Sequence, residues 1–104
     1  MKGLGNLGNL MKHAKQMQEQ LERAQAEIAD MRIVATAGGG MVTATVTGRG
    51  DLADLSIERE VIDPEDAEML VDLVIAAVQE AQQQARTESE HRLAPLSQGF
   101  GLSP

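Results

Sequence analysis

The apolar residues in the first third of the chain follow a spacing that predicts one long helix. Between residues 10 and 31 they recur at alternating steps of four and three, a heptad period that places them along one side of a helix. They are Leu10, Ala14, Met17, Leu21, Ala24, Ile28 and Met31. With Asn6 or Asn9 as the N-terminal cap, the helix would be about 35 to 40 Å long. A small domain cannot cover so long a helix from one side, so we expect part of it to contact a partner or to project into solvent.

The segment 32–59 changes to a period of two and is rich in β-branched residues, which is typical of strands. Short glycine-containing turns interrupt it and favour an antiparallel meander. We expect the three strands at residues 32–37, 41–47 and 55–59. In the second strand Val42, Ala44 and Val46 would face one side and the threonines the other, so one face of the sheet should be covered and the other wetter.

A second helix is predicted to begin within residues 63–66. Asp63 can accept hydrogen bonds as an N-terminal cap, Pro64 suits the first helical position, and the acids suit the positive end of the helix dipole. Between residues 69 and 78 this helix is apolar on nearly every side, more than one face of a sheet can cover. Beyond that stretch it becomes polar and rich in glutamine, and we expect it to end before Pro95.

Together these segments predict an α+β fold of order α-β-β-β-α in a single domain of residues 1–96. A flexible leader of about residues 1–8 and a disordered tail of residues 97–104 would flank the folded part. The 104-residue chain has no Trp, Tyr or Cys, so its core is aliphatic and small for a stable monomer, and we expect a homodimer. The residues expected in the core or the dimer interface are Leu21, Ile28, Leu70, Leu73, Val74, Ala77 and Val78.

The net charge of −7 is divided unevenly along the chain. Residues 1–52 carry +1 and residues 53–104 carry −8, while the first eighteen residues contain three lysines and no acid. Three bases of the first helix would lie about 180° from the apolar seam, facing outward, where a phosphate can be met. Two glutamates share that side, so the same charges also suit an ordinary solvated helix. The candidate DNA-contacting residues are Lys2, Lys12, Lys15 and Arg23.

Other local patterns do not predict catalysis, a metal or a cofactor. The Gly-x-Gly-x-x-Gly pattern at residues 3–8 lacks the preceding strand that a dinucleotide site needs, and the glycines at 38–40 join two strands as a turn. Glu88 and His91 share a helix face at a spacing found in metal sites, but polar residues surround them instead of further carboxylates. The absence of Cys excludes thiolate catalysis and sulfur-ligated zinc.

No apolar segment is long enough to span a membrane, and the N-terminal sequence does not resemble a secretory signal. We therefore expect a cytoplasmic protein with no membrane partner, no small-molecule substrate and no enzyme activity. A chain without Trp or Tyr has few side chains that can stack on bases, so contact with the backbone of duplex DNA is favoured over the reading of single strands or RNA loops.

Two motifs are specific enough to suggest a family. They are Asn-Leu-Met-Lys at residues 9–12 and Glu-Met-Leu-Val-Asp-Leu-Val at residues 68–74. With the segments 14–18, 46–48 and 62–66, in this order along nearly the whole chain, they resemble the YbaB/EbfC family of bacterial nucleoid-associated proteins. The resemblance implies an intertwined homodimer whose helices project as two arms, with duplex DNA bound between or along them in the nucleoid. It implies no enzyme activity.

Two functions stay open at this point, because the chain has few bases for a DNA-binding protein. The loop 49–54 has one base and two acids, which weakens binding to phosphates. The first function is a nucleoid-associated homodimer that coats or bridges duplex DNA with little sequence specificity, with a role in nucleoid organisation and gene regulation. The second is an acidic scaffold dimer that acts through protein partners in replication or recombination. A salt titration of DNA binding separates them.

Overall fold

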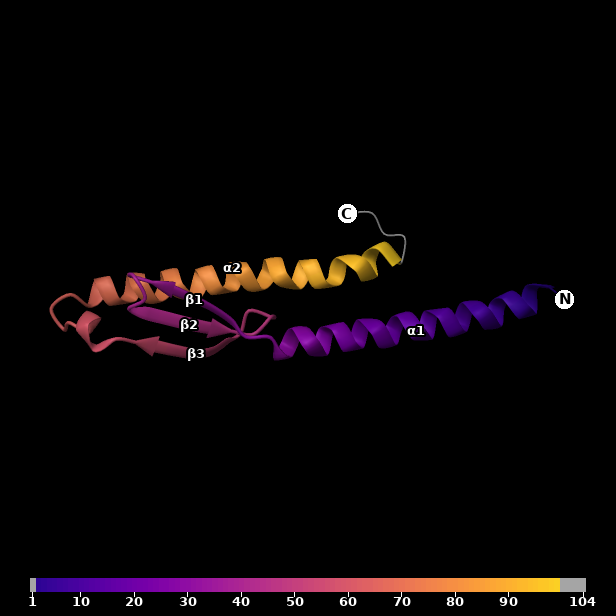
Figure 1. Ribbon diagram of the computed structural model, residues 1–104, viewed down its shortest axis with the longest axis horizontal. Helices are drawn as coiled ribbons and strands as arrows, with labels where there is room; N and C mark the ends of the chain where they lie inside the picture. The colour runs from indigo at the N-terminus through magenta and orange to yellow at the C-terminus, as the bar shows by residue number, and fades with distance from the viewer. Residues whose placement is uncertain (1, 100–104) are drawn as a thin grey trace.

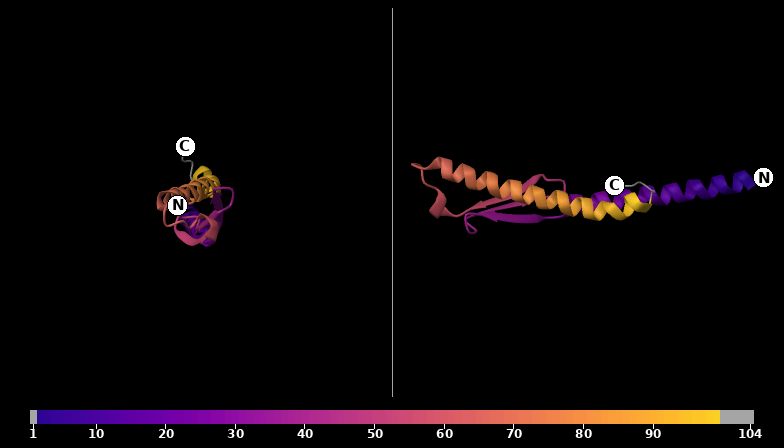
Figure 2. Two further views of the ribbon diagram at one scale, coloured as in Figure 1. Left: turned by 90° about the vertical axis from the view of Figure 1, so that its left-hand side faces the viewer. Right: turned by 90° about the horizontal axis from the view of Figure 1, so that it is seen from above.

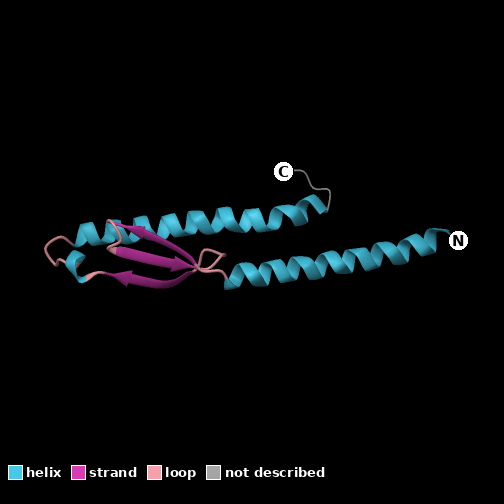
Figure 3. Ribbon diagram, in the orientation of Figure 1, coloured by secondary structure: helices cyan, strands magenta, loops and turns pink. Residues whose placement is uncertain are grey.

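Two long helices flank three short strands along the chain (Figure 1, Figure 3). The structure is a computed structural model that describes the backbone of residues 2–99 and the side chains of residues 6–97. Its elements are α1 (Lys2–Asp30), β1 (Ile33–Ala37), β2 (Val42–Val46), β3 (Leu52–Ile57), the short 3-10 helix η1 (Arg59–Val61) and α2 (Ala67–Gly99). The predicted α-β-β-β-α order is confirmed.

The three strands form one antiparallel sheet in the order β1-β2-β3, which confirms the predicted meander. Ala44, at the centre of β2, pairs with Ala35 on one side and with Leu55 on the other. The three glycines of the β1–β2 turn, residues 38–40, have φ values of 64°, 67° and 95°. Glycine adopts this left-handed conformation without steric strain, which explains why the turn contains no other residue type.

The core lies between the sheet and α2, which crosses one face of the sheet over β1 and β2 (Figure 1). On this inner face Val42, Ala44 and Val46 are completely buried, and the predicted alternation along β2 is confirmed. The side of α2 that meets the sheet is a ladder of alanines four residues apart, whose small size lets the helix approach closely. The ladder consists of Ala77, Ala81 and Ala85, all completely buried.

The N-terminal helix begins earlier than predicted. α1 starts at Lys2 and not at Asn6 or Asn9, so the expected leader of residues 1–8 is helical from residue 2 onwards. Its glycines each cost about 1 kcal/mol of helix propensity, which is why the sequence suggested a leader outside the helix. The segment contains no proline, however, and each residue added to an existing helix gains a hydrogen bond, so the helix extends through it.

The start of α2 was predicted a few residues too early. Asp63 does not cap the helix, because its Oδ1 accepts a hydrogen bond from the backbone N–H of Glu65 at 3.0 Å within a preceding turn. The capping role belongs to Asp66, whose Oδ1 accepts a hydrogen bond from the N–H of Met69 at 3.3 Å. The acidic segment holds two possible caps, and the structure uses the second.

The end of α2 also differs from the prediction. The helix continues through Pro95 to Gly99, so residues 97–99 of the expected tail are helical, and residues 100–104 lie outside the described residues. A proline inside a helix removes the hydrogen bond to the carbonyl four residues earlier. Here that carbonyl belongs to His91, an exposed residue near the end of the helix, where water can replace the lost partner.

The third strand is displaced toward the N-terminus. β3 spans Leu52–Ile57 and not residues 55–59, whereas β1 and β2 match their predicted ranges within one residue at each end. A register shift between Thr45 and Val46 lets Val46 pair with Leu52 and so extends the strand backward. At the other end Arg59 begins η1, which the sequence did not suggest.

The protomer is strongly elongated, with extents of 79 × 22 × 16 Å. Its radius of gyration is 20.9 Å, whereas a compact chain of this length would have about 13 Å. The cause is α1, which runs past the end of α2 into solvent (Figure 2). We call residues 2–19 of α1 the arm and the rest of α1, residues 20–30, its base. The apolar seam is buried at Ile28 but exposed at Leu10, which confirms that part of this helix projects.

Candidate nucleic-acid interface

The arm carries the densest positive charge in the described part of the chain. Lys12 and Lys15 lie one helical turn apart and are both exposed. Both ion pairs among the described side chains belong to Arg92, so neither lysine is neutralised there by a carboxylate at contact distance. No acid occurs among residues 1–18, and the first one along α1 is Glu19, one turn beyond Lys15, so the positive field is strongest around Lys12.

The other two predicted contacts are placed differently. Arg23 is exposed, but it lines a shallow hollow with Glu27 and Arg92, where the end of α2 meets α1. Lys2 begins α1, and its side chain lies outside the described part. The structure therefore brings Lys12 and Lys15 together and places Arg23 about two turns away, beside an acid.

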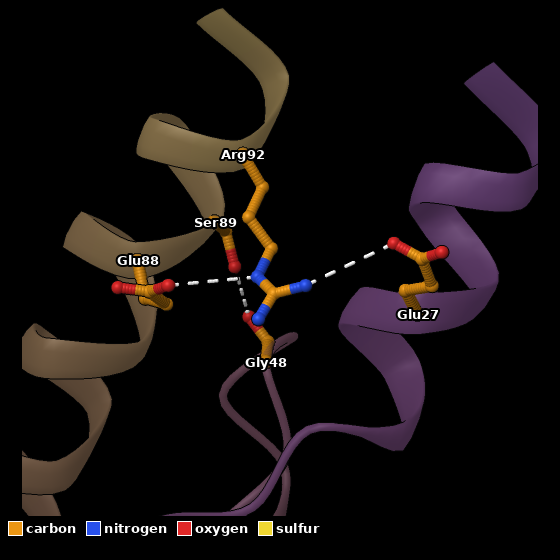
Figure 4. Close-up of polar contacts among 5 residues, drawn as sticks. All are labelled: Glu27, Gly48, Glu88, Ser89 and Arg92. Atoms are coloured by element: carbon orange, nitrogen blue, oxygen red, sulfur yellow. Dashed lines mark hydrogen bonds and ion pairs between the residues drawn. The ribbon is translucent and has the colours of Figure 1, made fainter. Parts of the chain in front are cut away.

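Arg92 joins the two helices at the base of the arm (Figure 4). Its Nη1 lies 3.8 Å from Oε2 of Glu27 on α1, and its Nε lies 3.5 Å from Oε1 of Glu88 on α2. All three side chains are about half exposed, so each pair contributes at most about 1 kcal/mol. Because two carboxylates already neutralise Arg92, it is a weaker phosphate contact than Lys12 or Lys15.

The β2–β3 loop also lies where α1 and α2 meet. The backbone N–H of Gly48 donates to the carbonyl of Ile28 at 3.0 Å, and a Cβ at position 48 would collide with that carbonyl oxygen. Ser89 Oγ donates to the carbonyl of Gly48 at 2.6 Å from the α2 side (Figure 4). The loop is thus bonded to both helices, and it supports the base of the arm.

Six of the seven residues predicted for the core or dimer interface are buried or pack against the core of their own protomer. Ile28 is 5% exposed and Ala77 is completely buried. The remaining five are half-buried, and all except Leu21 pack against the core of their own protomer. These five are Leu21, Leu70, Leu73, Val74 and Val78.

The sequence predicts that part of the apolar stretch 69–78 stays uncovered by the sheet, and the structure identifies which side chains these are. Val71 and Ile75, one turn apart on α2, are 54% and 47% exposed. Leu52 of β3 pairs with Val46 and so faces the inner side, yet it is 49% exposed because α2 covers mainly β1 and β2. The sequence signal is that a stretch apolar on nearly every side must leave some side chains exposed once one side packs on a sheet.

The described residues include no group of three or more His, Cys, Asp or Glu side chains that could hold a metal ion. Glu88 of the Glu-x-x-His pattern is paired with Arg92, and the glycines at 3–8 lie inside α1 rather than in a phosphate-binding loop. No helix in this part of the chain is both long and apolar enough to cross a membrane.

Comparison with protein families identifies one match over nearly the whole chain. The model of the YbaB/EbfC DNA-binding family matches residues 2–100. A nucleoid-associated protein of Streptomyces avermitilis is 46% identical over 99 residues, which cover 95% of this chain and 88% of that protein. A nucleoid-associated protein of Acetivibrio thermocellus is 43% identical over 100 residues, which cover 96% of this chain and 88% of that protein.

A solved structure shares the fold. An uncharacterized protein from Helicobacter pylori superposes with a TM-score of 0.66 at 26% sequence identity, over 85% of this chain and 88% of that one. The same arrangement of a long helix, three strands and a second long helix therefore occurs in a relative with much lower sequence identity.

Proposed function

This chain belongs to the YbaB/EbfC DNA-binding family, and we propose that it binds duplex DNA in the nucleoid as a homodimer, through phosphate contacts with little dependence on base sequence. The family is a DNA-binding family and not a family of enzymes. The proposal places the protein in the cytoplasm with DNA as its partner.

The observation that carries the proposal is the pair Lys12 and Lys15 on a projecting helix, neither of them in an ion pair with a described carboxylate. A lysine ammonium meets a phosphate as a point charge and does not read base edges, which explains the low expected sequence dependence. A homodimer would carry four such lysines, and each contact with a phosphate releases counterions from the DNA. Binding should therefore weaken steeply as salt rises.

The homodimer is supported by apolar surface that one protomer leaves open. Val71 and Ile75 form an exposed apolar pair on α2, and Leu52 is an exposed apolar residue on the inner side of the sheet. Exposed large apolar side chains are candidate interaction sites, and a chain with so small a core would gain stability if a second copy covered them. We assign this α2 side to the interface between the two copies.

The test is a salt titration of binding to a duplex of mixed sequence, with full-length protein and with Lys12→Glu and Lys15→Glu combined. The double reversal should weaken binding at low salt by about tenfold or more and make the salt dependence shallower. Arg59→Glu is the control, because Arg59 is exposed on η1, far along the chain from the arm.

Two outcomes would contradict the proposal. If the double reversal binds duplex DNA as well as the parent, the arm is not the contact surface. If the parent protein shows no salt-dependent binding even at low salt, the acidic dimer acts through protein partners instead.

A further inference from the structure

A groove of about 380 Å³ lies between the β2–β3 loop and α2, at the base of the arm. Residues 48–50 of the loop form one wall, and Gln82, Arg86, Ser89 and Glu90 of α2 form the other. We call it the waist groove. It is separate from the arm lysines and from the Arg92 ion pairs, and two of the chain's six arginines line it.

The loop wall of the waist groove is held by hydrogen bonds on both sides of Arg49. Ser89 Oγ donates to the carbonyl of Gly48 at 2.6 Å, and Gln82 Nε2 donates to the carbonyl of Gly50 at 3.0 Å. Both bonds are partly buried and join positions more than 30 residues apart in sequence. The backbone on both sides of Arg49 is therefore held in place before a ligand binds, which lowers the entropy cost of binding through Arg49.

The two arginines of the groove are available to a ligand. Arg49 and Arg86 are exposed, and neither takes part in the ion pairs found among the described side chains. Arg86 Nη1 donates to Oε1 of Gln83 at 3.2 Å, which leaves its other guanidinium N–H groups free for a second acceptor. Two planar guanidinium groups at one groove can both donate to the oxygens of a phosphate, and this contact requires no particular base.

Glu90 also lines the waist groove and opposes an anion there. The groove nevertheless keeps a net positive charge, because its two arginines face one glutamate. A carboxylate at the edge of a phosphate site lowers its affinity without removing it, since the water-exposed charges are screened. Neutralising Glu90 should therefore strengthen phosphate binding, whereas loss of an arginine should weaken it.

We infer that the waist groove binds a backbone phosphate of duplex DNA between Arg49 and Arg86, as a second anchor beside the arm. The inference depends on the proposed function. Gly48 is hydrogen-bonded to Ile28, and Lys12 lies sixteen residues from Ile28 along α1, or about 24 Å. The groove lies on the Ile28 side of α1, whereas Lys12 and Lys15 project from the opposite side, so the two anchors contact separate stretches of the DNA backbone.

The experiment measures the salt dependence of binding to the same mixed-sequence duplex, with full-length Arg49→Gln and Arg86→Gln combined. Loss of one phosphate contact should make the salt slope shallower by about one for each groove that touches the DNA. Arg59→Gln removes an exposed arginine outside the groove and should leave the slope unchanged. Thermal melting of each variant checks that the fold is intact.

Glu90→Gln provides the test of opposite sign. Removal of this negative charge should tighten binding about two- to threefold at low salt and less at high salt. The inference is overturned if the double arginine variant keeps the parent slope, if Arg59→Gln lowers the slope equally, or if Glu90→Gln weakens binding. In each of these cases Lys12→Glu with Lys15→Glu still reports on the arm, so failure of the groove and failure of the proposed function are distinguishable.

Discussion

At the scale of single residues, Gly48 is the glycine with the least room for a side chain among those the structure describes. Its N–H donates to the carbonyl of Ile28 at 3.0 Å, so the two backbones are in direct contact where α1 meets the sheet. A side chain there meets a carbonyl oxygen, which cannot move aside as a flexible side chain could. The constraint is steric and not a matter of φ, since Gly48 is absent from the residues with positive φ.

Gly48→Ala should therefore destabilise the protein by about 2 kcal/mol or more, because either the loop or the end of α1 must shift. Denaturant unfolding measures the effect. Gly8→Ala is the matched control, since a Cβ at Gly8 meets nothing within 4 Å and alanine favours a helix. Equal stability of Gly48→Ala and the parent would show that the junction is more adaptable than its geometry suggests.

Sequence alone predicts part of the junction around Arg92. Glu88 and Arg92 are four residues apart, and this spacing predicts their pairing on any helix. The second partner, Glu27, is 65 residues away in the chain, and no local pattern connects it with Arg92. The same limit applies to the waist groove, because Arg49 and Arg86 meet only after the loop has been bonded to α2.

At the scale of elements, the packing of α2 on the sheet depends on small side chains. Ala81 lies in the middle of the buried ladder, on the side of α2 that packs against the completely buried inner residues of β2. The sequence analysis placed Ala77 in the core but not Ala81 or Ala85, because their segment is rich in glutamine. The spacing of four between these alanines was visible, and it indicates one continuous helix face.

Ala81→Leu should destabilise the protein by about 1 to 3 kcal/mol, because three extra carbons must fit into a packed helix–sheet contact. Ala94→Leu makes the same change at an exposed position on the same helix and should have little effect. Thermal unfolding monitored by circular dichroism compares the two. A stabilising effect of Ala81→Leu would mean that the ladder encloses unfilled space.

At the scale of the whole molecule, the elongated shape of the protomer and its exposed apolar surface both follow from its two long helices. A protomer whose radius of gyration is 20.9 Å leaves parts of both long helices uncovered, and in the proposed homodimer the second copy covers them. Composition predicted self-association from the small aliphatic core. Composition could not predict which side of α2 forms the interface. Residues 69–78 are apolar on nearly every side, and only the structure shows which side packs against the sheet.

Two exposed valines allow a matched test of the proposed interface. Val71 on α2 and Val34 on β1 are both 54% exposed, but Val34 pairs with Thr45 and so lies on the outer face of the sheet, which is otherwise polar. A glutamate at Val71 would place a charge in the interface between two copies, at a cost that the same change on a wetted face does not incur. The two substitutions make the same chemical change on two different surfaces of the protomer.

Sedimentation of the parent at micromolar concentration should give about 22 kDa, twice the 11.1 kDa of one chain. Val71→Glu should lower this mass or abolish folding, because it places a charge in the proposed interface, while Val34→Glu should remain a dimer. A compact and stable 11 kDa parent would refute the homodimer. A dimer that survives Val71→Glu but dissociates with Val34→Glu would contradict the proposed interface on α2 and place it on the outer face of the sheet.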